Sequence, residues 1–397
     1  MRDEFPIFAK HPNLIYFDTA ATAHKPACVI EALSRFYAED YATVHRAIYQ
    51  NSLHATELYN GARETVRQFL NAEKSEEIVF TRGTTDALNL VALSWGKAHI
   101  GAGDEIVVSE MEHHSNLVPW QLLAEKTGAK IRWIPMNLDG TLAWQEAIRP
   151  GVKLVAVGHI SNVTGTINPI REIVEAAHRV GAVVVVDGAQ AAPHQRVDVQ
   201  ALGCDFYAFS GHKCYGPTGV GVLYGKQSRL EEMAPIEGGG DMIESVTLEK
   251  TTFAKPPLRF EAGTPIIGSV IGLKAALEWM QRRGLEKLAL HETKLRIRFE
   301  EQLKMIKGVK ILGTAASKGA LCTFVIEGVH PLDLATWLDL QKIALRSGHL
   351  CAQPTLKKFG LETAIRASFG AYNTVEEVDR VCGAIRTFCD RYRTGRG

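Results

Sequence analysis

Short, continuous apolar segments in the middle of the chain set the strongest limit on its fold. KLVAVGHIS (153–161) and AVVVVDGA (182–189) are expected to be strands, and neither shows the polar alternation of a strand with one solvent-facing side. A helix-forming stretch, PIREIVEAAHRVG, lies between them. Strands buried on both faces and joined by helices predict an α/β layered domain with a mostly parallel sheet.

The rest of the chain suggests two domains. Further strands are expected at 76–80, 104–110, 130–136, 205–211 and 220–225, with helices at about 85–99 and 116–127. The Gly- and Pro-rich segment 234–265 is expected to be irregular, and a long helix is expected at about 266–307. The remainder indicates an α+β unit that ends in a helix from about 375. We therefore expect a large domain over 15–260 and a smaller one over 261–397, which also takes in residues 1–14.

Charge and composition exclude several classes of protein. The 397 residues include 45 Lys+Arg and 44 Asp+Glu, so the net charge of +1 argues against a protein that binds nucleic acid or membranes electrostatically. Hydrophobic residues make up 46% and charged residues 22%, as in ordinary globular proteins. We expect neither a membrane span nor a signal peptide, because the apolar runs are short and the N-terminus lacks the signal pattern.

The seven cysteines are scattered along the chain, and they contain no CxxC pair. A disulfide framework and a cysteine-based metal site are therefore not expected. Free thiols fit a reducing compartment, so the sequence predicts a cytoplasmic protein.

Two residues at expected strand ends carry the strongest chemical signal. Asp187 closes the apolar strand VVVVD, and Lys213 follows the next strand in SGHK. Ligands bind at the carboxyl ends of strands in open α/β sheets. A buried lysine has a lowered pKa and forms Schiff bases, and an aspartate keeps a pyridinium nitrogen protonated. The pair indicates a pyridoxal phosphate site, although each residue taken alone is also compatible with a surface lysine or a capping aspartate.

A phosphate site is expected at TRGTTDALNL, where Gly83 precedes Thr84 and Thr85 at a helix start. An ordinary threonine cap remains an alternative. Ser210 and His212, which flank Lys213, are expected to add donors. No GxxxxGK[ST] occurs, and no GxGxxG follows a strand, so P-loop and nicotinamide sites lack support.

Other candidate residues follow neighbouring strands. His113 and His114 in MEHHSN are expected at the same sheet edge, where one imidazole could stack on a flat ring and move protons. A surface histidine pair remains the alternative, and a metal site lacks a third ligand. Asn162 could hydrogen-bond a ring substituent or serve only as a turn residue.

The C-terminal half contributes a thiol and a guanidinium. Cys351 lies in RSGHLCAQP near Arg346 and His349, whose charges would favour a thiolate. A buried, inert cysteine is the alternative. Arg366 in AIRASFG has the planar fork that suits a substrate carboxylate, or it could serve in a structural ion pair.

Taken together, these motifs resemble the Suf-type cysteine desulfurases of the class V aminotransferase family, a group that includes selenocysteine-lyase-like members. The likeness runs from YFDTAAT (16–22) to YNTVEEVDR (372–380) and is most specific over DGAQAAPHQRVDVQALGCDFYAFSGHK. It implies fold type I of the pyridoxal phosphate enzymes, in which a large domain has a mainly parallel seven-stranded sheet between helices. A smaller α+β domain would carry the cysteine loop.

The resemblance also implies residue roles. Lys213 would hold the cofactor, Asp187 its ring nitrogen and Gln190 its phenolic oxygen, while His113 would stack on the ring. Thr84, Thr85, Ser210 and His212 would hold the phosphate, and Thr264 of EAGTP would reach the phosphate of a partner subunit, which implies a homodimer. The substrate would be held by Asn162, Arg366, Arg346 and His45, the last of which lies beside Arg46 in an entrance motif. Cys351 would attack the substrate sulfur.

The implied reaction converts L-cysteine to L-alanine and passes sulfur through a persulfide to an acceptor protein of the Suf type for iron–sulfur cluster assembly. Selenocysteine lyase and cysteine sulfinate desulfinase are the alternatives. The chain departs from the family text at Leu350, where relatives often have His, and at Cys214, where they often have Leu. The Leu350 change questions a proton-transfer or gating role for that position.

Overall fold

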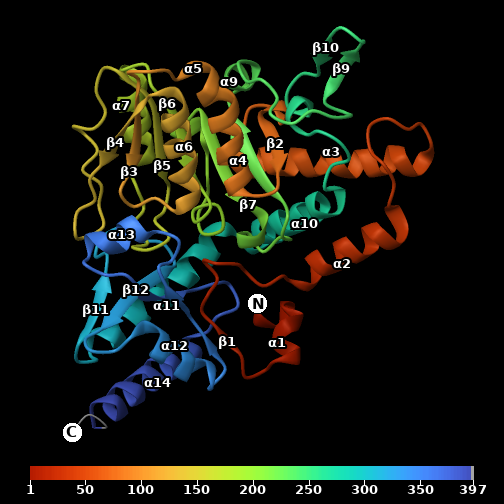
Figure 1. Ribbon diagram of the computed structural model, residues 1–397. Coiled ribbons are helices and arrows are strands. Elements are labelled where there is room, and N and C mark those ends of the chain that lie inside the picture. The colour runs from red at the N-terminus through yellow and green to blue at the C-terminus, as the bar shows by residue number, and fades with distance from the viewer. Residues whose placement is uncertain (395–397) are drawn as a thin grey trace.

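The chain folds around a seven-stranded sheet. The computed structural model describes residues 1–394 (Figure 1). Strand β8 is antiparallel to β2 and β7, and the other four neighbouring pairs are parallel. The strands, in their order across the sheet, are β2 (Ile78–Thr81), β8 (Gly221–Gly225), β7 (Phe206–Ser210), β6 (Val183–Asp187), β5 (Val152–Gly158), β3 (Glu105–Ser109) and β4 (Lys130–Ile134).

Both faces of this sheet are buried, which confirms the expectation drawn from its continuous apolar strands. Val184 and Val186 of β6 enter one apolar cluster, and Val183 and Val185 enter the cluster on the opposite face. Helices α4 (Thr84–Val91) and α6 (Val118–Thr127) cover one face. The other face is covered by α3 (Gln50–Leu70), α7 (Ile170–Arg179) and α10 (Ile267–Arg283).

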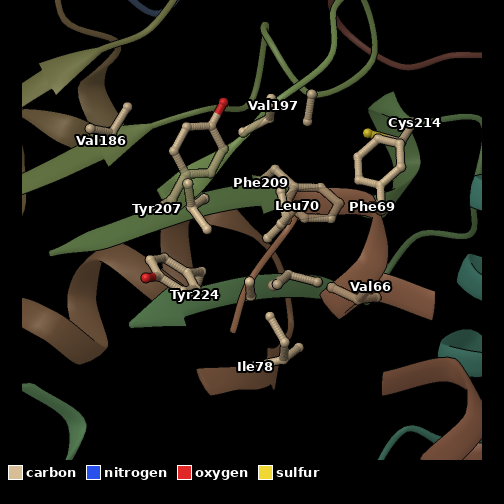
Figure 2. Close-up of a cluster of buried hydrophobic side chains, with 14 of the residues drawn as sticks. Val66, Phe69, Leu70, Ile78, Val186, Val197, Tyr207, Phe209, Cys214 and Tyr224 are labelled. Carbon is tan, nitrogen blue, oxygen red and sulfur yellow. The ribbon is translucent and has the colours of Figure 1, made fainter. Parts of the chain in front are cut away.

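Figure 2 shows part of the core between α3 and the sheet. Tyr207 and Phe209 of β7 lie near Phe69 and Leu70 of α3, and all four side chains are buried. These side chains contribute large apolar surfaces, which fix the helix against the sheet. The rigid sheet in turn sets the positions of the residues at its carboxyl edge.

A second, smaller sheet supports the C-terminal part of the chain. Its antiparallel order is β11 (Val309–Leu312), β12 (Leu321–Ile326), β15 (Ala364–Ser368) and β14 (Arg346–Gly348). A separate apolar cluster joins it to three helices, α11 (Leu285–Lys304), α12 (Pro331–Asp339) and α14 (Val375–Thr394). The α/β fold with an additional α+β unit is thus as expected.

Two expectations about the elements are wrong. The helix expected over 266–307 is two helices, α10 and α11, because Gly284 between them has a φ of 83° and ends the first. The segment 234–265, expected to be irregular, contains a hairpin of β9 (Ile243–Val246) and β10 (Thr251–Phe253), which projects from the body of the molecule (Figure 1). Polar residues on this exposed hairpin hide its strand pattern.

The remaining elements are short. The helix expected at 85–99 runs through α4, the π-helical turn η4 (Ala92–Gly96) and α5 (Lys97–His99). The others are η1 (Arg2–Glu4), α1 (Pro6–Lys10), α2 (Ala27–Arg35), η2 (Phe36–Asp40), η3 (Ser75–Glu77), η5 (His114–Asn116), α8 (Val199–Leu202), η6 (Gly211–Lys213), α9 (Gln227–Glu231), η7 (Leu258–Phe260) and α13 (Gln353–Lys358).

Contacts cross the expected domain boundary near 260, and the boundary stays a prediction. Helix α10 begins after it but packs against α2 and α3. Strand β1 (Ile15–Tyr16) pairs in parallel with β13 (Ile343–Ala344), so the N-terminal strand lies beside the C-terminal unit. Within residues 1–394, none of the helices combines the length and apolar character needed to cross a membrane.

Candidate active site

A cavity lies where strands of the large sheet end. Its volume is about 470 Å³, within the range of small-molecule sites. Residues that follow β3, β5, β6 and β7 line it, together with the start of α4. The loop after β14 and Arg366 of β15 close it from the smaller sheet. The cavity therefore joins the two units of the fold, and we call it the strand-edge pocket.

Asp187 and Lys213 both line this pocket. Asp187 ends β6, and its Oδ1 accepts the backbone N–H of Ala189 at 2.9 Å. Burial raises the pKa of Asp187 and lowers that of Lys213, while the attraction between the two groups opposes both shifts. The fold thus places a desolvated amine close to a buried carboxyl group, as the spacing of the two strands predicts.

Gln190 lies in the turn after β6 and leaves one polar atom unpaired. Its Nε2 donates to the carbonyl oxygen of Ala20 at 2.8 Å, and its buried Oε1 has no partner. A buried acceptor without a partner is costly. A polar group on a molecule in the pocket would satisfy it.

The start of α4 lies on the same edge of the sheet and lines the pocket with two threonines. The backbone N–H of Thr84 donates to Ser210 Oγ at 2.9 Å, and the two hydroxyl oxygens lie 2.7 Å apart. Thr85 Oγ1 lies 2.7 Å from Ser115 Oγ. Gly83 and Gly221 approach so closely that a Cβ on Gly221 would come within 2.4 Å of the Gly83 Cα. Free N–H groups and hydroxyls at a helix start favour a phosphate.

His113 is half-buried, lines the pocket and is held in its neutral form. Burial lowers its pKa to about 3, and the positive charges of Lys213 and Arg366 add to the effect. His113 Nδ1 accepts the backbone N–H of Ser115 at 3.0 Å, so Nε2 carries the ring proton. His212 also lines the pocket, and burial lowers its pKa to about 4.

Arg366 is bonded to Asn162, and a residue from the N-terminal segment links it to Arg346. Arg366 donates through Nη1 to the Asn162 carbonyl at 2.9 Å, and its buried Nε has no partner. Asp18 pairs with Arg366 at 3.4 Å and with Arg346 at 2.7 Å. One carboxylate thus balances two guanidinium groups, which leaves a net positive charge for an anionic ligand.

Cys351 is exposed and also lines the pocket. It lies between β14 and α13, and its carbonyl accepts the backbone N–H of His114 at 2.8 Å. Its own backbone N–H donates to His349 Nδ1 at 3.1 Å. The thiol of Cys351 is therefore accessible from solvent and shares a cavity with Lys213, which excludes the alternative of a buried, inert cysteine.

Two expected site residues lie away from the pocket. His45 has a φ of 72°, and its ring lies 5.5 Å from that of Tyr59. Thr264 is exposed at a smaller cavity of about 170 Å³, which Arg82 and Glu261 also line. Within one chain, neither residue can serve the strand-edge pocket.

The sequence reasoning missed two carboxylates that lie at the site. Glu112 precedes His113; its carboxylate is bonded to Ser109, to Asn116 at 2.6 Å and to the N–H of Gly158 at 2.9 Å, and burial raises its pKa to about 7. Its position beside the histidine pair was a usable signal. Asp18 gave none, because its partners follow more than 320 residues later.

Comparisons with known proteins agree on one family. The profile described as Aminotransferase class-V matches residues 15–381. A protein of Halalkalibacterium halodurans named "Probable cysteine desulfurase" is 50% identical over 381 residues, 94% of each chain. The "Cysteine desulfurase" of Synechococcus elongatus is 47% identical over 401 residues; the match takes in 100% of this chain but 63% of that longer protein.

Solved structures give the same result. The apo structure of the cysteine desulfurase from Thermococcus onnurineus NA1 superposes with a TM-score of 0.94 at 41% identity, over 98% of this chain and 97% of that one. A mutant of C-DES with glycine covalently linked to its PLP cofactor has a TM-score of 0.84 at 25% identity, over 97% and 99%. With a family profile matched over almost its whole length, this chain belongs to the class-V aminotransferases.

Proposed function

We propose that the protein is a pyridoxal phosphate-dependent cysteine desulfurase, which converts L-cysteine to L-alanine and takes up the sulfur as a persulfide on Cys351. The observation that carries the proposal is the union, in one cavity, of a half-buried lysine, a buried aspartate and an exposed thiol. An ordinary aminotransferase has no use for that thiol. The names of the relatives favour desulfurase over selenocysteine lyase or cysteine sulfinate desulfinase.

The residues of the pocket fit pyridoxal phosphate. Asp187 is a buried acceptor for a ring N–H, and the unpaired Gln190 Oε1 suits a ring hydroxyl. The start of α4, with Thr84, Thr85 and Ser210, suits the phosphate. When bound through Lys213, the cofactor supplies an electron sink that stabilises negative charge on the substrate carbon atoms.

Substrate binding is assigned to Arg366, Asn162 and Arg346. The planar guanidinium of Arg366 keeps its buried Nε free for a carboxylate oxygen. Arg346 is about half exposed and brings a second positive charge to the mouth of the pocket. An amino acid held by its carboxylate would have its Cα and side chain directed between Lys213 and Cys351.

Proton transfer is assigned to Lys213 and His113. Burial lowers the pKa of Lys213, so its neutral amine is available to remove the Cα proton of the substrate. His113 is neutral and holds a proton on Nε2, which it can give to a developing charge. Both groups lie beside the same cavity, so a proton taken at Cα need not pass through bulk water.

Sulfur transfer is assigned to Cys351. Its sulfur attacks the substrate sulfur, an S–S bond forms, and the Cβ–S bond breaks. The electron pair of that bond stays on Cβ and is protonated, and Lys213 returns the proton it took from Cα, which yields alanine. The product on the enzyme is a Cys351 persulfide, whose terminal sulfur faces the exposed side of the loop.

We further propose that the protein is a homodimer. Aromatic and aliphatic side chains are exposed on α2, η2, α3 and the connection between η2 and α3; the two helices α2 and α3 extend to one side of the molecule (Figure 1). They are Ile30, Tyr37, Tyr41, Ile48, Tyr49 and Leu53, of which Ile48 is 94% exposed. A second copy would cover this patch. His45 and Thr264 lie outside the pocket of their own chain. In a homodimer they would instead complete the pocket of the partner subunit.

The acceptor and the cell compartment also belong to this proposal. The exposed Cys351 lies on a short loop, which suits a Suf-type acceptor protein that collects the persulfide sulfur for iron–sulfur cluster assembly. The seven free cysteines fit the reducing cytoplasm. Cell fractionation that finds the protein outside the cytoplasm would contradict this location.

A turnover assay tests the function. The purified protein is expected to be yellow and to form alanine from L-cysteine, faster when a sulfur acceptor is present. Mass spectrometry should find one additional sulfur atom on the peptide that contains Cys351. Light scattering tests the homodimer, which a fully active monomer at the assay concentration would contradict. A wild-type protein that forms no alanine from L-cysteine would contradict the enzymatic proposal.

A further inference from the structure

We propose that Leu350 is a positioning residue whose burial fixes Cys351 over the strand-edge pocket; this inference rests on the proposed function. Leu350 is 6% exposed, whereas the adjacent Cys351 is exposed. The loop therefore turns one side chain into the protein and the next one out of it. The resemblance had left the role of a leucine at this position open.

The backbone of this pair is in an uncommon conformation. Leu350 has a φ of 54° and Cys351 a φ of 53°, so two consecutive residues with side chains adopt the left-handed region. This region is unfavourable for residues other than glycine, and for leucine especially so. Such a conformation persists only where surrounding contacts over-determine it, so the contacts of Leu350 and its neighbours decide the position of the thiol.

The first set of contacts is apolar. Leu350 belongs to a small cluster of buried residues that is separate from the three larger ones. Val163 in this cluster follows Asn162 at the pocket, and Leu312 and Ala364 come from the smaller sheet. The other buried members are Ala352 and Leu356. Leu350 thus attaches the loop to both units of the fold at their junction.

The second set of contacts holds the backbone. Asn162 Nδ2 donates to the Leu350 carbonyl at 2.7 Å, and the His114 N–H donates to the Cys351 carbonyl at 2.8 Å. Both donors come from loops of the large sheet that line or adjoin the pocket. The apolar contacts of Leu350 and these two hydrogen bonds therefore hold the same two residues, Leu350 and Cys351.

The consequence for the reaction is geometric. A nucleophile that is displaced by about 1 Å can lose roughly 100-fold in rate. If Leu350 is shortened, the apolar contacts that hold the left-handed conformation are lost, and Cys351 is free to leave its place. Steps that precede sulfur transfer depend on Lys213 and Asp187, which the sheet edge holds, and are expected to be unaffected.

The test compares Leu350→Ala with two controls. Leu350→Met keeps apolar contact, and Leu361→Ala removes the same atoms from a residue at the border of the same cluster. Three quantities are measured on the full holoenzyme: alanine formation from L-cysteine, alanine formation from L-selenocysteine, and the rate at which iodoacetamide alkylates Cys351. Leu350→Ala is expected to lower the first by about 10- to 100-fold, to leave the second within twofold and to change the third severalfold, while both controls stay near wild type.

The outcomes separate this inference from the proposed function. If Leu350→Ala and Leu361→Ala have equal rates with L-cysteine, or if Leu350→Ala loses both substrates equally, the positioning role is wrong. If wild-type protein releases no alanine from L-cysteine, the proposed function fails. The alkylation rates still report the loop in that case, and equal rates in wild type and Leu350→Ala would overturn the positioning role by themselves.

Discussion

The carboxyl edge of the large sheet and the loop after β14 both contribute residues to the strand-edge pocket, but they hold these residues in place in different ways. On the sheet edge, Asp187 and Lys213 are placed by buried strands and are themselves desolvated. On the loop, Cys351 is exposed and is placed by a strained backbone that an apolar cluster holds. The first arrangement tunes the protonation of groups that stay in place. The second leaves a thiol accessible for a sulfur atom that has to leave the protein.

The largest expected effect concerns Lys213 at the edge of the large sheet. Lys213→Ala should lower alanine formation by at least about 10⁴-fold with either L-cysteine or L-selenocysteine, because it removes both the attachment point of the cofactor and the base. The visible absorption that borohydride removes should be lost as well. Lys304→Ala, at an exposed helix end, is the control. A Lys213→Ala protein with an unchanged reducible band would contradict the assignment.

Substitution of Cys351, on the loop after β14, should affect the turnover of one substrate more than that of the other. Cys351→Ser is expected to abolish alanine formation from L-cysteine but to leave much of it from L-selenocysteine, since selenium is a better leaving group than sulfur and does not need the thiol. Cys28→Ser, at a half-buried cysteine, should change neither. Near-normal turnover of L-cysteine by Cys351→Ser, measured with an acceptor present, would replace the persulfide mechanism with a simple lyase.

A third variant tests the junction between the two regions. Arg366→Lys keeps the charge but loses the planar fork, so KM for L-cysteine should rise by about 10- to 100-fold. The yellow colour should persist, because Arg366 is not assigned to the cofactor. Arg298→Lys, which alters a bidentate pair with Asp379 on the surface, serves as a control. An unchanged KM in Arg366→Lys would remove the carboxylate role.

The smallest expected effect concerns His159, a buried residue directly after β5, and the pH dependence of the free energy of unfolding. Burial lowers the pKa of His159 to about 4, below the value near 6.5 of an unfolded chain. The unfolded state therefore binds the proton first, and stability is lost as the pH falls from about 6.5 to 4, by about 2 kcal/mol at pH 5. The free energy of unfolding, measured with urea at pH 7 and at pH 5, should therefore fall by less in His159→Gln than in the wild-type protein. An equal loss in both proteins would contradict the prediction.

The sequence predicts the sheet edge well, because the ends of parallel strands must meet. Asp187, Lys213 and Asn162 follow apolar strands that periodicity identifies, and all three line the pocket. The sequence does not predict the hairpin of β9 and β10, because polar residues hide its strand pattern. It also does not predict the break between α10 and α11, because a single glycine, Gly284, produces it. The assigned roles of the site residues remain predictions.

Residues that act through distant partners are the ones that sequence spacing cannot reveal. Asp18 is separated from Arg366 by 348 positions, and only the folded chain brings them together. The position of Leu350 in the interior is equally hidden, because a leucine beside a reactive cysteine in a glycine-containing loop has no periodic pattern around it. For His45 and Thr264, a single chain shows only that they lie outside its own pocket.

The pairing of the first strand with the C-terminal unit also bears on when the site forms during translation. The segment of β1, Asp18 and Ala20 reaches residues 343–368 through strand pairing, an ion pair and a hydrogen bond to Ser368. These partners are synthesised after the last strand of the large sheet, β8, which ends at Gly225, so every strand of that sheet is made before the closed side of its pocket. The pocket can therefore close only after residues 343–368 have been added to the chain, and a nascent chain that stops before them lacks both Cys351 and Arg366.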